Sequence, residues 1–209
     1  MEVIKKSLGQ MGTNCYVIWD EKSLAAAVID PGFEDQRIIN IIKENKLNVK
    51  YILLTHGHFD HLGGVAQIKQ LTGAKVLINE IDADCLGDSR RNLSVLAGMS
   101  MELESADGFL KEDEPIMLGD INIRVIHTPG HSKGGVCLLA EDVLFSGDTL
   151  FNTSIGRTDF ADGDLNELLN AIMSKLFILD DSTKVLPGHG DDTTIGYEKM
   201  NNPFLKGRF

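Results

Sequence analysis

Four side chains that can bind a metal ion lie close together in one segment, Thr55-His56-Gly57-His58-Phe59-Asp60-His61. Neutral imidazole and carboxylate groups are the usual ligands of zinc and similar divalent ions, and a hydrolytic site keeps one position open for water. The apolar run at 51–54 predicts a buried strand before this segment, and the run at 63–68 predicts a helix after it. The candidate ligands therefore lie on a loop between a strand and a helix.

The spacing inside this loop indicates two metal positions. If the backbone stays extended through His58, the side chains of His56 and His58 point the same way, because strand side chains repeat every two residues. Asp60 and His61 then turn towards a second position. One short loop can therefore serve two ions.

Three further candidate ligands each follow a predicted strand. They are His131, Asp148 and His189, after apolar runs that end at residues 126, 145 and 186. Two halves, each a sheet with helices, would bring these side chains to the loop at 55–61 at one edge of the sheets.

Periodicity predicts the elements that must position these residues. Short apolar runs predict strands around 3–4 and at 15–19, 25–29, 51–54, 74–79, 116–118, 121–126, 136–139, 143–145 and 184–186. Helices are predicted at 34–46, 63–68 and 165–176, the first from isoleucines at 38, 39, 41 and 42. The first three strands are expected to form an antiparallel meander in an α/β fold.

The segment 80–114 has no clean period. It is expected to hold one or two helices that cover the mouth of the site. Its apolar side chains could contact a substrate or the core, and helical spacing favours the core for Leu93, Leu96, Met99 and Met101.

Length and composition set the broad class. With 209 residues and 43% apolar content, the chain is expected to form one domain over residues 1–209. A net charge of −11 argues against a nucleic-acid partner. No signal-peptide run and no bilayer-spanning stretch occur, so a cytoplasmic protein without membrane contact is expected. Cys15, Cys85 and Cys137 are scattered, which fits reduced, buried thiols.

The ordered set His-x-His-x-Asp-His, His, Asp, His resembles the metallo-beta-lactamase superfamily of hydrolases over almost the whole chain. The resemblance implies a four-layered αβ/βα sandwich, with two sheets between helices. It also implies a first metal site of His56, His58 and His131, a second of Asp60, His61 and His189, and Asp148 as a carboxylate that bridges both. The expected cofactors are two divalent ions, with zinc first and iron or manganese as alternatives.

Within the superfamily the chain resembles the short bacterial glyoxalase II type, the hydroxyacylglutathione hydrolases. The fragments that carry this resemblance are Gly147-Asp148-Thr149-Leu150-Phe151, Gly156-Arg157-Thr158-Asp159-Phe160, Pro187-Gly188-His189-Gly190 and Asn202-Pro203-Phe204-Leu205. The bridging carboxylate departs from the lactamases, which argues against a beta-lactam substrate. Full-length glyoxalase II adds a C-terminal helical domain that helps hold glutathione and that this chain lacks. The thiol part of the substrate is therefore expected to be glutathione or another small thiol.

The expected chemistry is hydrolysis of a small acyl thioester, with Asp60 and Asp148 as the candidate catalytic carboxylates. Two ions about 3.5–4 Å apart can share one water, lower its pKa and polarise a carbonyl oxygen, so a metal-bound hydroxide would be the nucleophile. Arg157 is a candidate anchor for a substrate carboxylate, or else forms a salt bridge with Asp159 or Asp162.

Two more residues have alternative roles. Asp30 either orients a ligand histidine or is the ordinary acid of an Asp-Pro-Gly turn. His127 is the histidine left over, and a structural role is expected for it.

Other functions use the same motifs. Persulfide dioxygenases share them but hold one iron, which here would bind His56, His131 and Asp148. A phosphodiesterase of the transfer-RNA-processing kind also uses a bridged pair of ions, and the acidic balance disfavours it. A non-catalytic binding module has no need of all seven ligands. The pattern does not indicate an oligomeric state.

Overall fold

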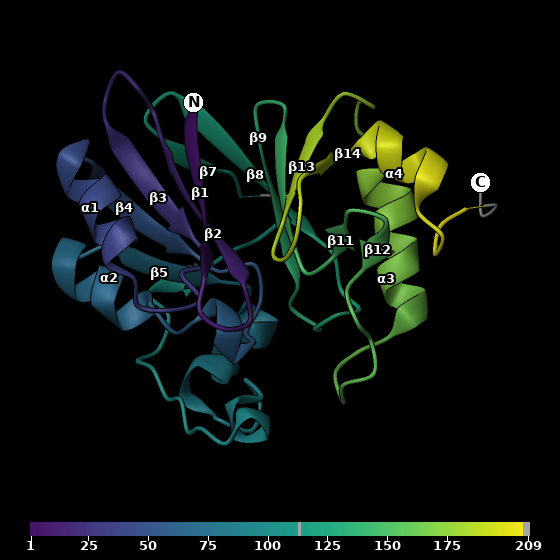
Figure 1. The fold of residues 1–209 in the computed structure, drawn as a ribbon, viewed down its shortest axis with the longest axis horizontal. Coiled ribbons are helices and arrows are strands. Elements are labelled where there is room, and N and C mark those ends of the chain that lie inside the picture. The colour runs from purple at the N-terminus through teal and green to yellow at the C-terminus, as the bar shows by residue number, and fades with distance from the viewer. Residues whose placement is uncertain (113, 207–209) are drawn as a thin grey trace.

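The computed structural model describes residues 1–112 and 114–206 of the chain. The first sheet contains, in spatial order, β1 (Glu2–Leu8), β2 (Thr13–Trp19), β3 (Ala25–Ile29), β4 (Asn48–Leu53), β5 (Lys75–Ile78) and β6 (Gly108–Phe109). Strands β1 to β3 pair antiparallel, as the meander predicted, and β3 to β6 pair parallel. Helices α1 (Gln36–Glu44) and α2 (Val65–Thr72) cover the outer face of this sheet (Figure 1).

The second sheet contains, in spatial order, β14 (Thr193–Thr194), β13 (Lys184–Pro187), β10 (Val143–Gly147), β9 (Val136–Ala140), β8 (Ile121–His127) and β7 (Ile116–Leu118). Its outer face is covered by α3 (Leu165–Ala171), which continues as the π-helical turn η4 (Ile172–Leu176), and by α4 (Ile195–Asn201) (Figure 1). A small hairpin of β11 (Leu150–Phe151) and β12 (Ser154–Ile155) lies beside them. The four-layered αβ/βα sandwich is thus confirmed.

Three buried apolar clusters fill the spaces between the four layers. The isoleucines of α1 pack against the first sheet, for example with Ile52 of β4. Between the sheets, the rings of Tyr16 and Phe145 meet edge to face at 5.2 Å. Leu168 of α3 packs in the third cluster, over the second sheet. Because each layer buries an apolar face, the 3.6- and 2-residue periods were enough to predict most elements.

The described residues of the segment 80–114 include two short 3-10 helices, η2 (Glu80–Gly87) and η3 (Ser94–Ala97). The preference for core packing was wrong for three of its residues. Leu96 is 71% exposed, Met99 is also exposed and Leu93 is only partly buried, whereas Met101 does pack on the core. The reason is that Asn92, fully buried, donates to the carbonyls of Cys85 and Met101 at 2.9 Å. These bonds close a loop on which Leu96 and Met99 stay exposed.

The elements after His189, and the β11–β12 hairpin, were not predicted. Their strands are two residues long, too short to show a period. No helix in residues 1–112 or 114–206 has the length and apolar character needed to cross a bilayer.

Candidate metal centre

The loops that carry the candidate ligands meet at one edge of the two sheets. Strands β10 and β13 run parallel, so the residues after their carboxyl ends, Asp148 and His189, lie on the same edge. Backbone bonds join this edge to the first sheet: Val136 N–H donates to the Thr55 carbonyl at 2.8 Å. The sequence prediction of a shared edge is confirmed.

Seven donor residues gather there in three overlapping groups. Within each group the three ligand atoms lie within 4.8 Å of one another. The groups are His56, His58 and His131; His56, His61 and Asp148; and Asp60, His61 and His189. The backbone at His58 is extended, with φ −77° and ψ 144°, and a 3-10 turn over Phe59–His61 then redirects Asp60 and His61.

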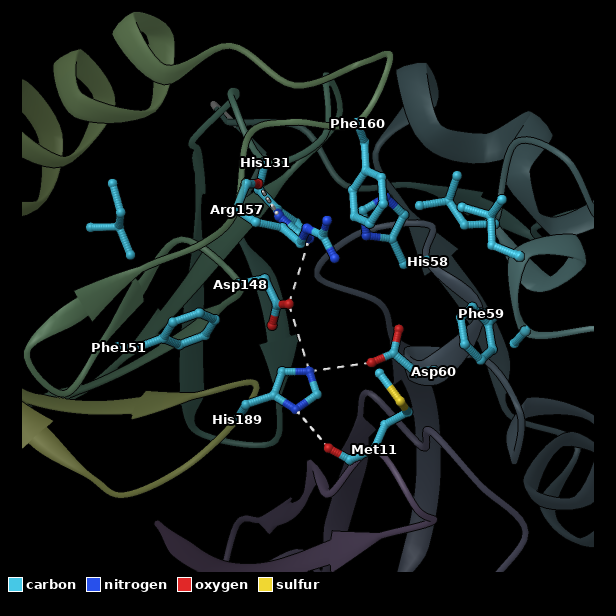
Figure 2. Close-up of a pocket in the computed structure, with 14 residues that line it drawn as sticks. Met11, His58, Phe59, Asp60, His131, Asp148, Phe151, Arg157, Phe160 and His189 are labelled. Atoms are coloured by element: carbon cyan, nitrogen blue, oxygen red, sulfur yellow. Dashed lines mark hydrogen bonds and ion pairs between the residues drawn. The ribbon is translucent and has the colours of Figure 1, made fainter.

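Asp148 lies between the two sets of histidines. Its Oδ1 is 3.4 Å from His61 Nε2, and its Oδ2 is 3.5 Å from His131 Nε2 and 3.6 Å from His189 Nε2. Figure 2 shows this carboxylate between His131 and His189, with Asp60 reaching His189 from the other side at 3.2 Å. This is the placement that a bridging ligand requires.

The donor atoms fit a divalent ion. The Nε2 atoms of His56, His61 and His131, together with Asp148 Oδ1, are buried and form no hydrogen bond, although His61 and His131 lie 3.4 and 3.5 Å from the Asp148 carboxylate. Buried polar atoms are almost always paired in folded proteins, so atoms that converge unpaired indicate a bound group. Imidazole nitrogens and carboxylate oxygens suit zinc, iron and manganese.

The charge states also suit metal binding. Burial lowers the pKa of His58 to about 3, so its imidazole is neutral and free to coordinate. For Asp148, burial alone would raise the pKa, but the neighbouring His61 and His131 lower it to about 2. His58 therefore offers a neutral imidazole and Asp148 an ionised carboxylate at neutral pH. The carboxylates of Asp30 and Asp148 raise the pKa of His61, so an ion that binds His61 must displace a proton.

Asp30 contacts the candidate ligand His61 through the ring nitrogen Nδ1. Its Oδ2 lies 3.0 Å from His61 Nδ1, and its two oxygens accept from Thr55 N–H at 2.8 Å and Thr55 Oγ1 at 2.6 Å. Asp30 also has a positive φ of 47°, a conformation that Asp tolerates better than most residues. Of the two alternatives for Asp30, the geometry fits orientation of His61.

Backbone carbonyls hold two other histidines. His131 Nδ1 lies 2.8 Å from the carbonyl oxygen of Arg157, and His189 Nδ1 lies 3.2 Å from that of Met11. Such contacts fix the ring orientation and leave Nε2 to face the site. A carbonyl has no residue-specific signal, so the sequence could not identify these partners.

The loop of His189 is tied to the first sheet. Asn14 Nδ2 donates to the carbonyls of Pro187 and Gly190, both at 2.9 Å, and Tyr16 Oη donates to Pro187 at 2.6 Å. Position 188 must be glycine, because a Cβ there would lie 2.2 Å from Asp148 Oδ1. Strand β2 therefore fixes the last histidine of the site.

Asp82 is a buried carboxylate that the sequence did not identify. It accepts from Gly57 N–H at 3.1 Å and from Gly134 N–H at 2.7 Å. Gly57 lies between His56 and His58, and Gly134 follows the loop of His131. One carboxylate thus joins the two loops that supply the first histidine group.

We therefore expect Asp82→Ala to weaken metal binding by about 10- to 100-fold, as loss of a partner behind the ligands commonly does. Competition with a chelator would measure the affinity. Asp84→Ala is the matched control, since Asp84 lies on the same 3-10 helix but is exposed and pairs with Arg91 at 2.8 Å. Equal affinities for both variants and the native protein would exclude a positioning role for Asp82.

A cavity of ≈ 660 Å³ opens beside the donor atoms, and Asp60, Asp148 and Arg157 contribute to its wall. The Arg157 guanidinium forms two bonds of 2.7 Å with Asp159, and Asp162 pairs with Lys133 instead, at 3.5 Å. Of the two predicted salt bridges, the one with Asp159 is present.

His127 lies apart from the three donor groups. Its Nε2 contacts the carbonyl of Lys133 at 2.9 Å, which agrees with the structural role expected for it.

Comparison with known proteins agrees with this arrangement. Hydroxyacylglutathione hydrolase GloC of Haemophilus influenzae is 40% identical over 203 residues, which cover 93% of each chain. The crystal structure of BLEG-1 B3 metallo-beta-lactamase superposes with a TM-score of 0.93 at 38% identity, covering 99% of this chain and 100% of that one. The structure of TTHA1623 in a di-iron-bound form gives 0.86 at 32% identity, covering 97% and 100%.

The family model described as the metallo-beta-lactamase superfamily matches residues 8–189. That stretch begins in β1 and ends at His189, so it includes all seven donor residues. The chain belongs to the metallo-beta-lactamase superfamily.

Proposed function

We propose that this chain is a metal-dependent hydrolase of small acyl thioesters, with hydroxyacyl thioesters of glutathione or another small thiol as substrates. The observation that carries the proposal is the Asp148 carboxylate, which contacts His61, His131 and His189. The similarity to hydroxyacylglutathione hydrolase GloC supports the thioester as the bond cleaved.

Two divalent ions complete the proposed site. His56, His58 and His131 would hold one ion, Asp60, His61 and His189 the other, and Asp148 would contact both. Bound there, they would supply Lewis acidity to the thioester carbonyl and lower the pKa of a water. Zinc is proposed first, and iron and manganese suit the same ligands. TTHA1623, whose solved form is di-iron, supports the iron alternative.

The chain's own residues position the reactants. Asp60 and Asp148 are ionised and line the cavity, so each can accept a hydrogen bond from a water and hold it towards the substrate. No cysteine competes as nucleophile, because burial raises the pKa of Cys85 to about 12 and of Cys137 to about 11. Burial likewise raises the pKa of Cys15. A water is therefore the proposed attacking group.

Beta-lactam hydrolysis is the second candidate, since BLEG-1 is similar in sequence and superposes closely. The position of Asp148 counts against it, because a bridging carboxylate is the feature in which the chain departs from the lactamase pattern. A one-iron dioxygenase is disfavoured for a different reason. It would leave the group of Asp60, His61 and His189 without a role.

The test is hydrolysis under anaerobic conditions by protein loaded in turn with zinc, manganese and ferrous iron. We expect two ions per chain and turnover of S-lactoylglutathione and of S-lactoyl-N-acetylcysteamine, abolished by a chelator and restored by metal. Cleavage of nitrocefin without thioester cleavage would favour the second candidate. One iron per chain, with oxygen uptake on glutathione persulfide, would establish the dioxygenase instead.

A further inference from the structure

We propose that the site selects an uncharged, apolar thioester in preference to the anionic thioester of glutathione. This inference rests on the proposed hydrolase function and concerns the part of the substrate that lies away from the scissile bond. Three observations carry it: the side chains of the cavity wall, the hydrogen bonds that hold one wall segment, and the pairing of Arg157 with Asp159.

The cavity wall is apolar apart from the donor residues and Arg157. The large side chains that form it include Met11, Phe59, Leu93, Leu96, Phe151 and Phe160. Figure 2 shows Phe59, Phe151, Phe160 and Met11 on different sides of the donor atoms. A ligand that fills this space buries its surface against hydrocarbon, which favours aliphatic groups.

Two of these side chains are unusually open to solvent. Leu96 is 71% exposed and Met11 is 61% exposed, although both border the cavity. Leu96 lies on η3 and Met11 lies in the β1–β2 turn. Two elements that are far apart in the sequence therefore each place an exposed apolar side chain at this cavity. Exposed apolar side chains grouped at a cavity mark a binding surface.

The segment that carries Leu96 is held rigidly. Leu93 has φ 67° and ψ 8°, a left-handed conformation that is strained for a leucine. The Asn92 amide maintains it through its bonds to Cys85 and Met101. The backbone of this segment is therefore preformed, and ordering it for a ligand costs little.

The charged side chains of the cavity wall disfavour anionic ligands. Glutathione carries two carboxylates, and each needs a cationic partner when it is desolvated. Among the lining residues that the structure describes, Arg157 is the only lysine or arginine. Its guanidinium is neutralised by two bonds to Asp159 and lies 4.1 Å from the centre of the Phe160 ring. The net charge of −11 also disfavours an anion.

The first experiment compares S-hexanoyl-N-acetylcysteamine with S-hexanoylglutathione on the metal-loaded protein. The two substrates share the acyl group and differ only in the thiol. We expect kcat/KM to be about tenfold or more higher for the uncharged thioester, because unpaired carboxylates resist burial. A preference for the glutathione thioester would overturn the inference and leave the hydrolase function standing. Failure to cleave either compound, together with no turnover of S-lactoylglutathione or S-lactoyl-N-acetylcysteamine, would overturn the hydrolase function itself.

Two variants test whether Leu96 of the cavity wall contacts the substrate. Leu96→Glu is expected to lower kcat/KM for S-hexanoyl-N-acetylcysteamine by about tenfold without changing metal content, since it places a charge against the acyl chain. Val95→Glu is the matched control, because Val95 is 44% exposed on the same 3-10 helix but does not line the cavity. Equal losses in the two variants would show that Leu96 does not contact the substrate.

Asp159→Asn tests the charge argument in the opposite direction. It removes the carboxylate that neutralises Arg157, so kcat/KM for S-hexanoylglutathione is expected to rise several-fold while the uncharged thioester is little affected. An equal change for both substrates would show that the Arg157–Asp159 pair has no part in selectivity.

Discussion

Replacement of Asp148 by asparagine is expected to lower kcat/KM for thioester hydrolysis by about three orders of magnitude. Metal ions contribute several kcal/mol of charge stabilisation to such reactions, and each ~1.36 kcal/mol is a factor of ten in rate. The carboxylate contacts His61, His131 and His189, so a neutral amide there weakens the hold on both proposed ions. Metal content should fall from two ions per chain towards one.

The measurements are metal content by elemental analysis and initial rates at saturating zinc. Asp120→Asn provides the control, since Asp120 is an exposed acid that pairs with Lys22 at 3.0 Å and lies outside the donor groups. A melting temperature close to that of the native protein would show that Asp148→Asn is folded. Retention of both ions and of the full rate would refute the bridging role of Asp148.

Replacement of Asp30 by alanine is expected to destabilise the fold by about 3 kcal/mol, through buried groups left without an acceptor. Thr55 N–H and Oγ1 lose their hydrogen bonds, and His61 Nδ1 loses its contact. Alanine is also strained at the positive φ of this position. For a chain of this size, the melting temperature should fall by about 6–12 °C. Metal affinity should fall as well, since His61 is no longer held.

Thermal unfolding and chelator competition measure the two effects of the Asp30 change. Asp30→Asn separates them, because asparagine tolerates the left-handed backbone and keeps an acceptor for Thr55 N–H. It should therefore melt above Asp30→Ala. Native stability and native metal affinity in the alanine variant would mean that Asp30 is only a turn residue.

The sequence predicted that the seven candidate ligands lie together, because its signals are local. The residues at 55–61 combine four donor side chains with a strand before them and a helix after them, and both elements have strong apolar periods. His131, Asp148 and His189 each follow a strand of the second sheet. Residue type and strand order were enough to place all seven at one edge.

The supporting contacts could not be predicted, because they join residues far apart in the chain. Asp82 is one of several acids in a segment without a period, and only its distances to Gly57 and Gly134 distinguish it. Leu96 shows the same limit, since its spacing from neighbouring apolar residues fits a core helix. The Asn92 bonds that turn its loop outwards are a tertiary effect.

The ties between strand β2 and the His189 loop bear on how the protein acquires its metal. Asn14 and Tyr16 hold Pro187 through hydrogen bonds that involve none of the candidate metal ligands, so we expect the last histidine to stay in place without a bound ion. In zinc fingers, by contrast, the metal itself makes the fold. We therefore expect the proposed ions to exchange while the chain stays folded, so that folding would not select one metal. Occupancy of the proposed site would then follow the relative supply of zinc, iron and manganese, weighted by their affinities for the same ligands.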